Sequence, residues 1–281
     1  MTVHVLIPVF NRLPMTQAIL TCLRAQRIDE PLSITVIDDG STDGSGEFLY
    51  AQPDVYVSKG DGTLWWGGAI HLGMRYVLEN AASTDWVVLV NNDTYLDPDF
   101  LQGLLKLARS QAPAAVGAAI RHPEPPHRLL SIGPRIDAWR LTVCDVLFDS
   151  GNNAQVISEV TPVDALSGRG VIYPVSALKA VHGLRPRWLP HYLADYELSM
   201  RVRKAGWQLL VSPTVSVQSD EDFGNLYRGL NWRDRFFSAR SPFYLPAQIC
   251  FWWAANSPLQ RISLPLRLVL FALFPALRKR I

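Results

Sequence analysis

The stretch Trp86-Val-Val-Leu-Val-Asn-Asn-Asp93 decides the fold prediction, because an apolar run ends there in two amides and a carboxylate. The β-branched run from Val87 to Val90 is typical of a strand that is buried on both faces of a parallel sheet. In open α/β sheets, ligands bind at the carboxyl ends of the strands. Asp93 is therefore placed to meet a ligand or a hard cation. A simple turn over Asn91 to Thr94 is the alternative explanation of the same residues.

The residues before this stretch alternate between strand and helix signals. Short buried strands are predicted at Val3 to Ile7, Ile34 to Ile37 and Val55 to Val57, and helices at Met15 to Arg27 and Ala69 to Asn80. Such alternation is typical of βαβ units, in which helices cover both faces of a parallel sheet. The first hundred residues are therefore predicted to form an α/β unit.

The following residues are less regular. Ala118 to Thr161 is rich in proline, glycine and polar residues, which favours sheet extensions and loops. A strand is predicted at Val163 to Val171 and an amphipathic helix at Ala194 to Ala205. No linker is evident before about residue 225.

Length and cysteine usage restrict the class of protein. A chain of 281 residues can bury a large core and accommodate one domain with an appendage. Its three cysteines, Cys22, Cys144 and Cys250, are far apart and form no disulfide or zinc pattern, which suits a reducing cytosol. Because the chain begins with strand-like residues, no signal peptide is expected.

The charge of the chain is concentrated at its C-terminal end. Residues 228–281 hold nine Lys or Arg and one acid, Asp234, so this tail is +8 and the first 227 residues are −6. The tail is also dense in aromatic and aliphatic residues. Its longest uncharged apolar stretch, Leu268 to Leu277, is shorter than the roughly 20 residues that a spanning helix needs. We therefore expect a segment lying at an anionic membrane surface. A helix packed on the protein's own core or on a dimer face is the alternative.

Two strand ends carry polar residues that suit a nucleotide. Ile7-Pro-Val-Phe-Asn11 presents a backbone edge that can face a flat ring, or it is a capped turn. Asp38-Asp-Gly-Ser-Thr-Asp43 delivers paired carboxylates to a loop, where they suit ribose hydroxyls or base N–H groups. The alternative is that Asp38 or Asp39 forms a turn and Asp43 caps a helix.

Two helix starts complete the candidate site. Lys59-Gly-Asp-Gly-Thr-Leu-Trp-Trp-Gly-Gly68 permits backbone amides to approach a phosphate, although it lacks the spacing of the common phosphate loops. Trp65 and Trp66 suit stacking on a base or sugar, or they are core aromatics. Asp195 stands at the start of a helix, where the dipole favours a carboxylate, so capping and catalysis are both open.

In this order and combination, the motifs resemble those of family 2 glycosyltransferases of the GT-A type. These are inverting enzymes that use nucleotide sugars and contain a Rossmann-like half. The resemblance covers residues 3 to about 217 and rests on Pro8 to Asn11, Asp38 to Asp43, the glycine-rich segment ending at Gly73, Asn91 to Asp93, and Asp195 to Arg201. Trp65-Trp-Gly-Gly68, Ser167-Gly-Arg-Gly170 and Leu189-Pro-His-Tyr192 further resemble a bacterial subgroup that is linked to surface polysaccharides such as O-antigen.

The resemblance implies roles for individual residues. Asp195 matches the general base, and Asp93 matches the last carboxylate of the metal-binding Asp-X-Asp motif, which holds Mg²⁺ or Mn²⁺. The first acid of that motif is Asn91 here, and Ala194 stands where an acid often precedes the base. The donor nucleotide sugar is expected to contact Pro8, Val9, Asn11, Asp39, Trp66, Gly67, Asn92 and Asp93. Contacts to the acceptor or diphosphate are expected from Arg169, His191 and Arg201.

The resemblance implies a GT-A α/β fold, with a mostly parallel sheet flanked by helices. The composition of the tail adds a helical, membrane-associating C-terminal segment. The catalytic domain is expected over residues 1–225, with a nucleotide-sugar-binding half over 1–100 and an acceptor half over 101–225. The C-terminal segment is expected over 226–281. A peripheral location on the inner face of the cell membrane and no nucleic-acid partner are expected, and a homo-oligomer is left open.

The expected reaction moves a sugar from a dTDP- or UDP-sugar, with dTDP-rhamnose as one candidate, to a hydroxyl of a glycan or lipid-linked saccharide. One alternative is a catalytically inactive nucleotide-sugar-binding protein, which Asn91 and Ala194 favour. A sugar nucleotidyltransferase is the other alternative. It fits less well, because residues 8–14 offer only Arg12 and no glycine for a triphosphate.

Overall fold

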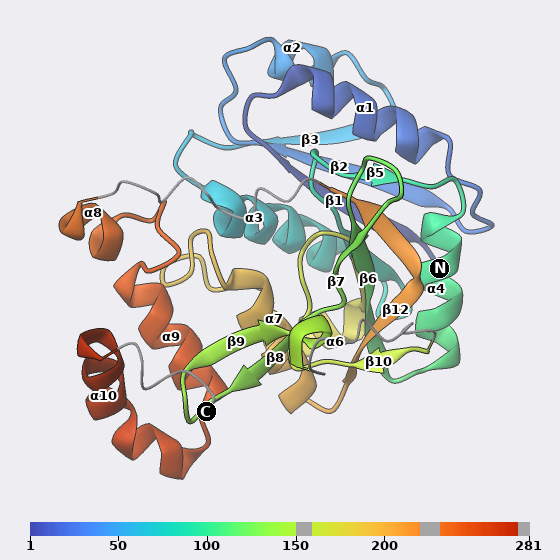
Figure 1. Ribbon diagram of the computed structural model, residues 1–281. Coiled ribbons are helices and arrows are strands. Elements are labelled where there is room, and N and C mark those ends of the chain that lie inside the picture. The colour runs from blue at the N-terminus through green and yellow to red at the C-terminus, as the bar shows by residue number, and fades with distance from the viewer. Residues whose placement is uncertain (150–158, 220–230, 275–281) are drawn as a thin grey trace.

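The computed structural model describes residues 1–149, 159–219 and 231–274, and Figure 1 shows their arrangement. Within these ranges one 10-stranded mixed sheet crosses the molecule. The sheet joins the first hundred residues to those that follow.

The first part of the chain forms the predicted βαβ units. Strands β1 (Val3–Val9), β2 (Leu32–Asp38), β3 (Val55–Lys59) and β4 (Trp86–Leu89) alternate with helices α1 (Leu13–Arg24), α2 (Ser45–Tyr50) and α3 (Trp65–Asn80). All pairings among these four strands are parallel. The prediction of a parallel α/β unit from its hydrophobic runs is therefore confirmed.

The second part extends the same sheet and adds a separate two-stranded sheet. Its elements are β5 (Tyr95–Leu96), α4 (Phe100–Ser110), β6 (Ala114–Arg121), β7 (Leu129–Ser131), β8 (Pro134–Asp137), β9 (Thr142–Asp145), α5 (Val146–Asp149), β10 (Thr161–Pro162), β11 (Val171–Pro174), α6 (Val175–Val181), α7 (Ala194–Lys204) and β12 (Gln208–Gln218). The strand order of the large sheet is β10-β12-β6-β11-β4-β1-β2-β3, with β5 paired to β12 and β7 paired to β6. Strands β8 and β9 pair with each other in the smaller sheet. Strand β11 runs antiparallel to both β4 and β6, whereas β6 and β12 are parallel to each other. Strands β6 and β12 therefore point the same way as the first four strands.

The predicted strand at Val163 to Val171 is wrong for most of its length. Strand β11 begins only at Val171, and the preceding residues form a loop that carries Gly168 and Gly170. Gly170 has a φ of +95°, which a β-branched residue cannot readily adopt. The apolar residues in this stretch, such as Val163 and Leu166, are buried as loop residues. Their burial explains why the hydrophobic pattern imitates a strand.

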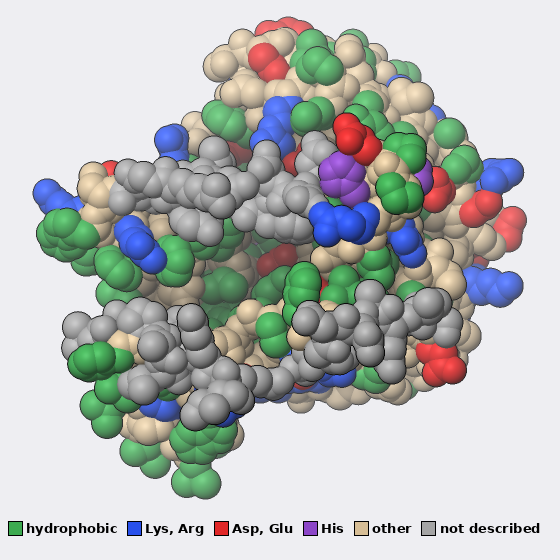
Figure 2. Space-filling model, viewed as in Figure 1, with side chains coloured by type: hydrophobic (Ala, Val, Ile, Leu, Met, Phe, Trp, Pro, Cys, Tyr) green, Lys and Arg blue, Asp and Glu red, His purple; other side chains and the backbone are tan. Residues whose placement is uncertain are grey.

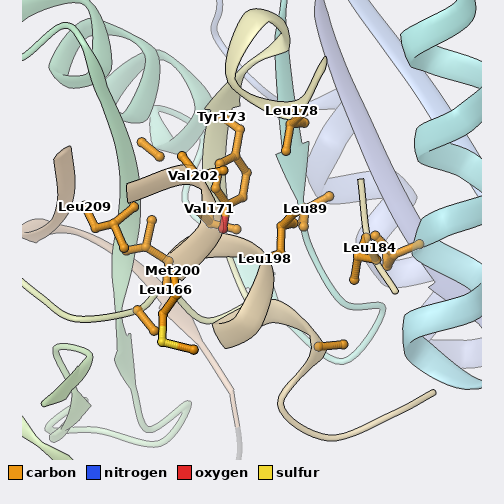
Figure 3. Close-up of a cluster of buried hydrophobic side chains, with 14 of the residues drawn as sticks. Leu89, Leu166, Val171, Tyr173, Leu178, Leu184, Leu198, Met200, Val202 and Leu209 are labelled. Atoms are coloured by element: carbon orange, nitrogen blue, oxygen red, sulfur yellow. The ribbon is translucent and has the colours of Figure 1, made fainter. Parts of the chain in front are cut away.

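Helices cover both faces of the sheet (Figure 1). Apolar residues of α1, α2 and α4 join one buried cluster, and those of α3, α6 and α7 join the other. Successive residues of β1 alternate between the two, with Leu6 in one cluster and Val5 and Ile7 in the other. Figure 3 shows Leu198 and Met200 of α7 in one buried cluster with Val171 and Tyr173 of β11. This three-layer arrangement fixes α7, and hence its first turn, against the sheet.

The C-terminal helices α8 (Trp232–Phe237), α9 (Leu245–Ala255) and α10 (Pro258–Leu273) follow. Phe251 of α9 and Leu264 and Phe271 of α10 belong to the core cluster of the second part. Arg267, which is also buried, donates to the carbonyl oxygens of Ala138 and Trp139 at the β8–β9 turn. The alternative of packing on the protein's own core is therefore confirmed for the inner face of α10.

The outer face of α10 is apolar and exposed. It carries Leu259, Ile262, Leu266 and Val269, spaced at intervals of three and four residues. Figure 2 shows hydrophobic side chains gathered at the lower left, over this part of the fold. Residues 275–277 of the predicted apolar stretch lie outside the described residues. No helix in the described ranges is both long and apolar enough to cross a membrane.

Candidate active site

The candidate site lies at one edge of the sheet, where its parallel strands end. Asn11, Asp39 and Asp93 follow β1, β2 and β4, whereas Arg169 precedes the antiparallel β11 and so reaches the same edge. Nη1 of Arg169 donates to Oγ of Ser219, just past β12, over 3.2 Å. The sheet topology therefore brings the polar residues of these strand ends to one edge, as the sequence predicted.

The loops after β1 and β2 are tied together by their own polar groups. The N–H of Asn11 donates to Oγ of Ser41 over 2.7 Å, and Oδ1 of Asn11 accepts from the N–H of Thr42 over 2.9 Å. The carbonyl of Val9 accepts from the N–H of Asp39, and Pro8 lies in register with Ile37. The residues predicted to surround the base are thus adjacent, and the amide oxygen of Asn11 is engaged with the scaffold.

Asp39 is the buried anchor of the loop that leads into α3. Its carboxylate accepts from the N–H groups of Gly62 at 2.9 Å, Leu64 at 3.0 Å and Trp65 at 3.1 Å. Burial raises the pKa of Asp39, and these three N–H groups oppose that rise. Three of the roughly four acceptor positions of a carboxylate are therefore used within the protein. A ribose or base can therefore bond only to the remaining acceptor position of the Asp39 carboxylate.

The other acids of this motif follow the alternative interpretation. Oδ1 of Asp38 accepts from the N–H of Ser41 over 3.0 Å. Asp43 accepts from the N–H of Leu13 at the start of α1 over 2.8 Å and from Ser45. Asp38 is therefore a turn former, and Asp43 satisfies an N–H that a helix start leaves without an intrahelical partner.

Trp66 and Gly67 join the two parts of the site. The N–H of Gly67 donates to the carbonyl of Pro190 over 2.7 Å, and a Cβ on Gly67 would lie 2.4 Å from the carbonyl oxygen of Leu189. Nε1 of Trp66 donates to Oδ1 of Asn91 over 2.8 Å. The Gly67 amide is therefore taken by the neighbouring loop. The prediction that Gly67 contacts the donor is not supported by these contacts.

The loop after β4 leaves one carboxylate oxygen for a ligand. Asn92 is buried, and its Nδ2 donates to Oγ1 of Thr16 over 3.3 Å. Oδ2 of Asp93 accepts from Nη1 of Arg12 over 3.0 Å. Oδ1 of Asp93 is buried and has no hydrogen-bond partner in the part of the chain that the structure describes. Asn92 therefore shapes the loop, and Asp93 presents an oxygen in need of a partner.

A divalent cation fits this donor set. The described residues contain no group of three or more His, Cys, Asp or Glu side chains arranged to enclose a metal ion. Mg²⁺ usually binds one or two carboxylates together with phosphates of the substrate, so a single carboxylate beside a diphosphate is sufficient. The side-chain oxygen of Asn91 is already engaged with Trp66. Asp93 is the residue that would hold the cation.

Asp195 lies in the first turn of α7, as predicted. Its Oδ2 accepts from the N–H of Gly168 over 2.8 Å, and its Oδ1 accepts from the N–H of Tyr196 over 2.9 Å. Burial raises the pKa of Asp195, while these N–H groups and the charge of Arg169 oppose the rise. A carboxylate with a raised pKa is a stronger base than an exposed one, which suits the removal of a proton.

His191 lies on the loop before α7. Its ring centroid is 5.8 Å from that of Trp65. Burial lowers the pKa of His191 to about 4, so the imidazole is neutral at pH 7. Its Nδ1 is buried without a hydrogen-bond partner in the described ranges. A neutral ring with an unused nitrogen fits a hydroxyl better than a diphosphate.

Arg201 serves the core of the protein instead of the site. Its Nε donates to the buried Glu197 over 2.8 Å, and its terminal nitrogens donate to the carbonyls of Val181 and Gly183. Glu197 and Arg201 are four residues apart on α7, a spacing at which helix side chains of opposite charge pair. The expected contact of Arg201 with the substrate is not supported, because its donors are directed to these groups.

Two arginines at this edge were not among the predicted site residues. Arg12 faces Asp93, and the guanidinium of Arg240 lies 5.4 Å from the ring centroid of Trp65. The position of Arg12 directly after Asn11 was a usable signal, because it places a cation at a strand end. For Arg240 the sequence offered no such signal, because this residue lies between α8 and α9, distant in sequence from Trp65.

Comparisons with known proteins agree with this arrangement. The chain belongs to glycosyl transferase family 2, whose model matches residues 4–147. It is 26% identical over 211 residues to the N-acetylglucosaminyl-diphospho-decaprenol L-rhamnosyltransferase of Mycobacterium tuberculosis. That match covers 67% of this chain and 66% of the relative.

Solved structures show the same fold at low sequence identity. GalNAc-T7 with UDP, GalNAc and Mn²⁺ has a TM-score of 0.60 and 12% identity, over 78% of this chain and 43% of that chain. TarS 1–349 of S. aureus in complex with UDP has a TM-score of 0.55 and 15% identity, over 78% of this chain and 60% of that chain. These neighbours establish the GT-A fold of the chain.

Proposed function

We propose that the protein is an inverting glycosyltransferase that transfers a sugar from a nucleotide-diphosphate donor to a hydroxyl of a lipid-linked saccharide. The observation that carries this proposal is the position of Asp195, a carboxylate with a raised pKa, at the sheet edge where Asp93 follows β4. Sugar transfer needs such a base beside the leaving diphosphate, and a cation held at Asp93 would bind that diphosphate. Family membership supports the same reaction class.

The base has a simple task in this reaction. The acceptor hydroxyl attacks the anomeric carbon of the donor sugar, and Asp195 takes the proton from that hydroxyl. The bond between the anomeric carbon and the diphosphate oxygen breaks as the new bond forms, and the electron pair leaves with the nucleotide diphosphate. One displacement without a covalent intermediate inverts the anomeric configuration. The N–H groups of Gly168 and Tyr196 hold the carboxylate in place.

The donor diphosphate is assigned to the region of Asp93. A divalent cation bound there would neutralise the charge that develops on the leaving diphosphate. GalNAc-T7, which shares the fold, was solved with UDP and Mn²⁺, and this supports Mn²⁺ or Mg²⁺ as the ion. Asp93 would hold this ion through the oxygen that lacks a partner among the described residues.

The relatives suggest the substrate classes. The mycobacterial relative is named for rhamnosyl transfer to an N-acetylglucosaminyl-diphospho-decaprenol, and TarS was solved with UDP and with UDP-GlcNAc. We therefore propose a dTDP- or UDP-sugar as the donor, with dTDP-rhamnose as one candidate. A polyprenyl-diphosphate saccharide in bacterial surface-polysaccharide synthesis is the proposed acceptor.

The proposed domain division keeps residues 1–225 as the catalytic unit and 226–281 as the C-terminal segment. For the latter we propose peripheral binding to an anionic membrane, since a lipid-linked acceptor is presented there. The support is the exposed apolar face of α10 together with the positive charge of the C-terminal segment. Residues 231–274 hold five Arg and one acid, Asp234.

A donor panel tests the function. The protein is incubated with UDP- and dTDP-sugars and a polyprenyl-diphosphate N-acetylglucosamine acceptor, with MnCl₂ or with EDTA. Release of nucleotide that depends on acceptor and metal, with a product of inverted configuration by NMR, is the expected result. Binding of a donor without turnover under every condition would instead favour the inactive binding protein.

A further inference from the structure

Arg12 forms an ion pair with Asp93 across the edge of the sheet. Its Nη1 lies 3.0 Å from Oδ2 of Asp93, and the side chain of Arg12 is 54% exposed. The other carboxylate oxygen, Oδ1, is buried without a hydrogen-bond partner among the described residues. The carboxylate assigned to a metal ion is therefore already paired with a cation of the protein.

The backbone holds Arg12 in this position. Asn11 and Arg12 have φ values of 59° and 65°, a left-handed conformation that asparagine tolerates but that is unfavourable for arginine. Hydrogen bonds of Asn11 with Ser41 and Thr42 fix the first residue, and the bond from Leu13 to Asp43 fixes the start of α1 just after the second. Such strained residues persist where the surroundings hold them, and they concentrate at functional sites.

The pair itself is weak enough to exchange. Ion pairs with this degree of exposure contribute little net stability. A divalent ion bound at Oδ1 would neutralise the same carboxylate and would repel the guanidinium, so it weakens the hold of Oδ2 on Arg12. Once released, the planar guanidinium of Arg12 can donate two parallel hydrogen bonds to phosphate oxygens. The geometry thus provides a cation at the diphosphate position that can change partners.

We propose that Arg12 is an exchanging cation, which neutralises Asp93 in the free protein and moves to the donor diphosphate when a divalent ion occupies Asp93. This inference rests on the proposed function, since its ligand is a nucleotide diphosphate. The exchange keeps a lone carboxylate from repelling the diphosphate before the metal arrives. It also supplies a second positive charge beside the metal in a site that has Asn91 in place of another acid.

Nucleotide binding without turnover tests the proposal. UDP and dTDP are titrated into the full-length protein by calorimetry, in EDTA and in MnCl₂. In EDTA, Asp93→Asn frees Arg12 and is expected to tighten nucleotide binding at least about fivefold relative to the unmodified protein. In MnCl₂, Arg12→Gln is expected to weaken binding by about 10–100-fold, since a charge-assisted hydrogen bond to the diphosphate is lost.

A matched variant separates exchange from a general change in charge. The gain of Asp93→Asn in EDTA should vanish when Arg12→Gln is added and persist when Arg24→Gln is added. Arg12 precedes the first residue of α1, whereas Arg24 is the last residue of this helix and pairs with Asp54 at 2.6 Å. Uridine and thymidine, which lack phosphate, should show no gain. Circular dichroism checks that every variant is folded.

Four results would overturn the role of Arg12. These are the absence of a gain in Asp93→Asn, a gain that survives Arg12→Gln, a gain with the nucleosides, and unchanged binding by Arg12→Gln in MnCl₂. If the unmodified protein binds neither UDP nor dTDP in MnCl₂, the proposed donor class is wrong, and the role of Arg12 is wrong with it. If the unmodified protein binds the nucleotides and the variants bind them equally well, the role of Arg12 is wrong, while the proposed donor class stands.

Discussion

The indole ring of Trp66 packs against Gly168, so closely that a Cβ on Gly168 would lie 2.2 Å from Cζ2 of the ring. Trp66 donates to Asn91 beside the proposed donor region, and Gly168 donates to the proposed base Asp195. This contact therefore connects the loop after β4 with the first turn of α7. The two regions cannot shift independently while the ring stays in place.

Gly168→Ala should disturb both regions at once. The added methyl group must displace Trp66, and overpacking of this kind typically costs about 1–3 kcal/mol of stability. We expect kcat to fall at least about 10-fold, because Asp195 loses the geometry of its Gly168 donor. Thermal unfolding and transfer kinetics measure the two effects.

The double variant Gly168→Ala with Trp66→Leu provides the control. A smaller side chain at position 66 gives the methyl group room, so the stability costs should be less than additive. Additive costs would show that the ring contact does not couple the two positions.

His191 is expected to remain neutral at physiological pH. Its pKa is lowered by burial to about 4, below the usual value of 6.5. Because the folded state binds fewer protons than the unfolded state between these values, the stability contribution of His191 rises as pH increases from about 4 to 6.5. A histidine NMR titration should show one resonance, absent in His191→Gln, with a midpoint near 4. A midpoint near 6.5 would contradict the burial argument.

The activity of the enzyme should depend on the ionisation of Asp195. Only the carboxylate can accept the proton, and its pKa is raised by burial above the usual 3.8. The acidic limb of the kcat profile should therefore lie above the pH at which an exposed aspartate titrates, with activity rising as pH increases. A profile that is flat down to about pH 4 would exclude a base with a raised pKa.

The outer face of α10 should mediate membrane binding. Ile262→Glu with Leu266→Glu places two charges on the exposed apolar face, and each large aliphatic side chain removed from the lipid forfeits roughly 1.5–3 kcal/mol. We expect the apparent affinity for anionic liposomes, measured by sedimentation, to fall at least about 100-fold.

Gln17→Glu with Gln111→Glu, at exposed positions away from α10, is the charge-matched control and should retain liposome binding. Equal loss in both double variants would indicate a general charge effect. Removing everything after residue 240 is a poorer test, because Phe251 and Leu264 belong to the core.

Hydrophobic periodicity was sufficient to predict the parallel strands and their ligand-facing edge. Buried runs such as Val87 to Val90 have few structural alternatives, and parallel strands end at a common edge. The loop before β11 has the apolar pattern of a strand, because its residues are buried in the same way. The sequence could not reveal the αL turn at Arg12, which is held by bonds from segments distant in the chain.

Individual site residues were harder to predict than their location. Asp39 and Gly67 lie at the expected edge, but their polar groups are used by Leu64 and Pro190. Residue type alone does not distinguish a carboxylate that binds a ligand from one that anchors a loop, because both are acids at strand ends. Asp93 differs by its oxygen without a partner in the described part of the chain, which only a structure can show.

The assignment of Asp195 as the general base is the central claim, and transfer by Asp195→Asn tests it most directly. An amide at this position keeps the size of the side chain but cannot take the proton from the acceptor hydroxyl. With a nucleotide-sugar donor and a polyprenyl-diphosphate acceptor, we predict that kcat falls at least ~100-fold. Donor binding, measured by calorimetry, should remain close to that of the unmodified protein. Near-normal turnover by Asp195→Asn would contradict the assignment.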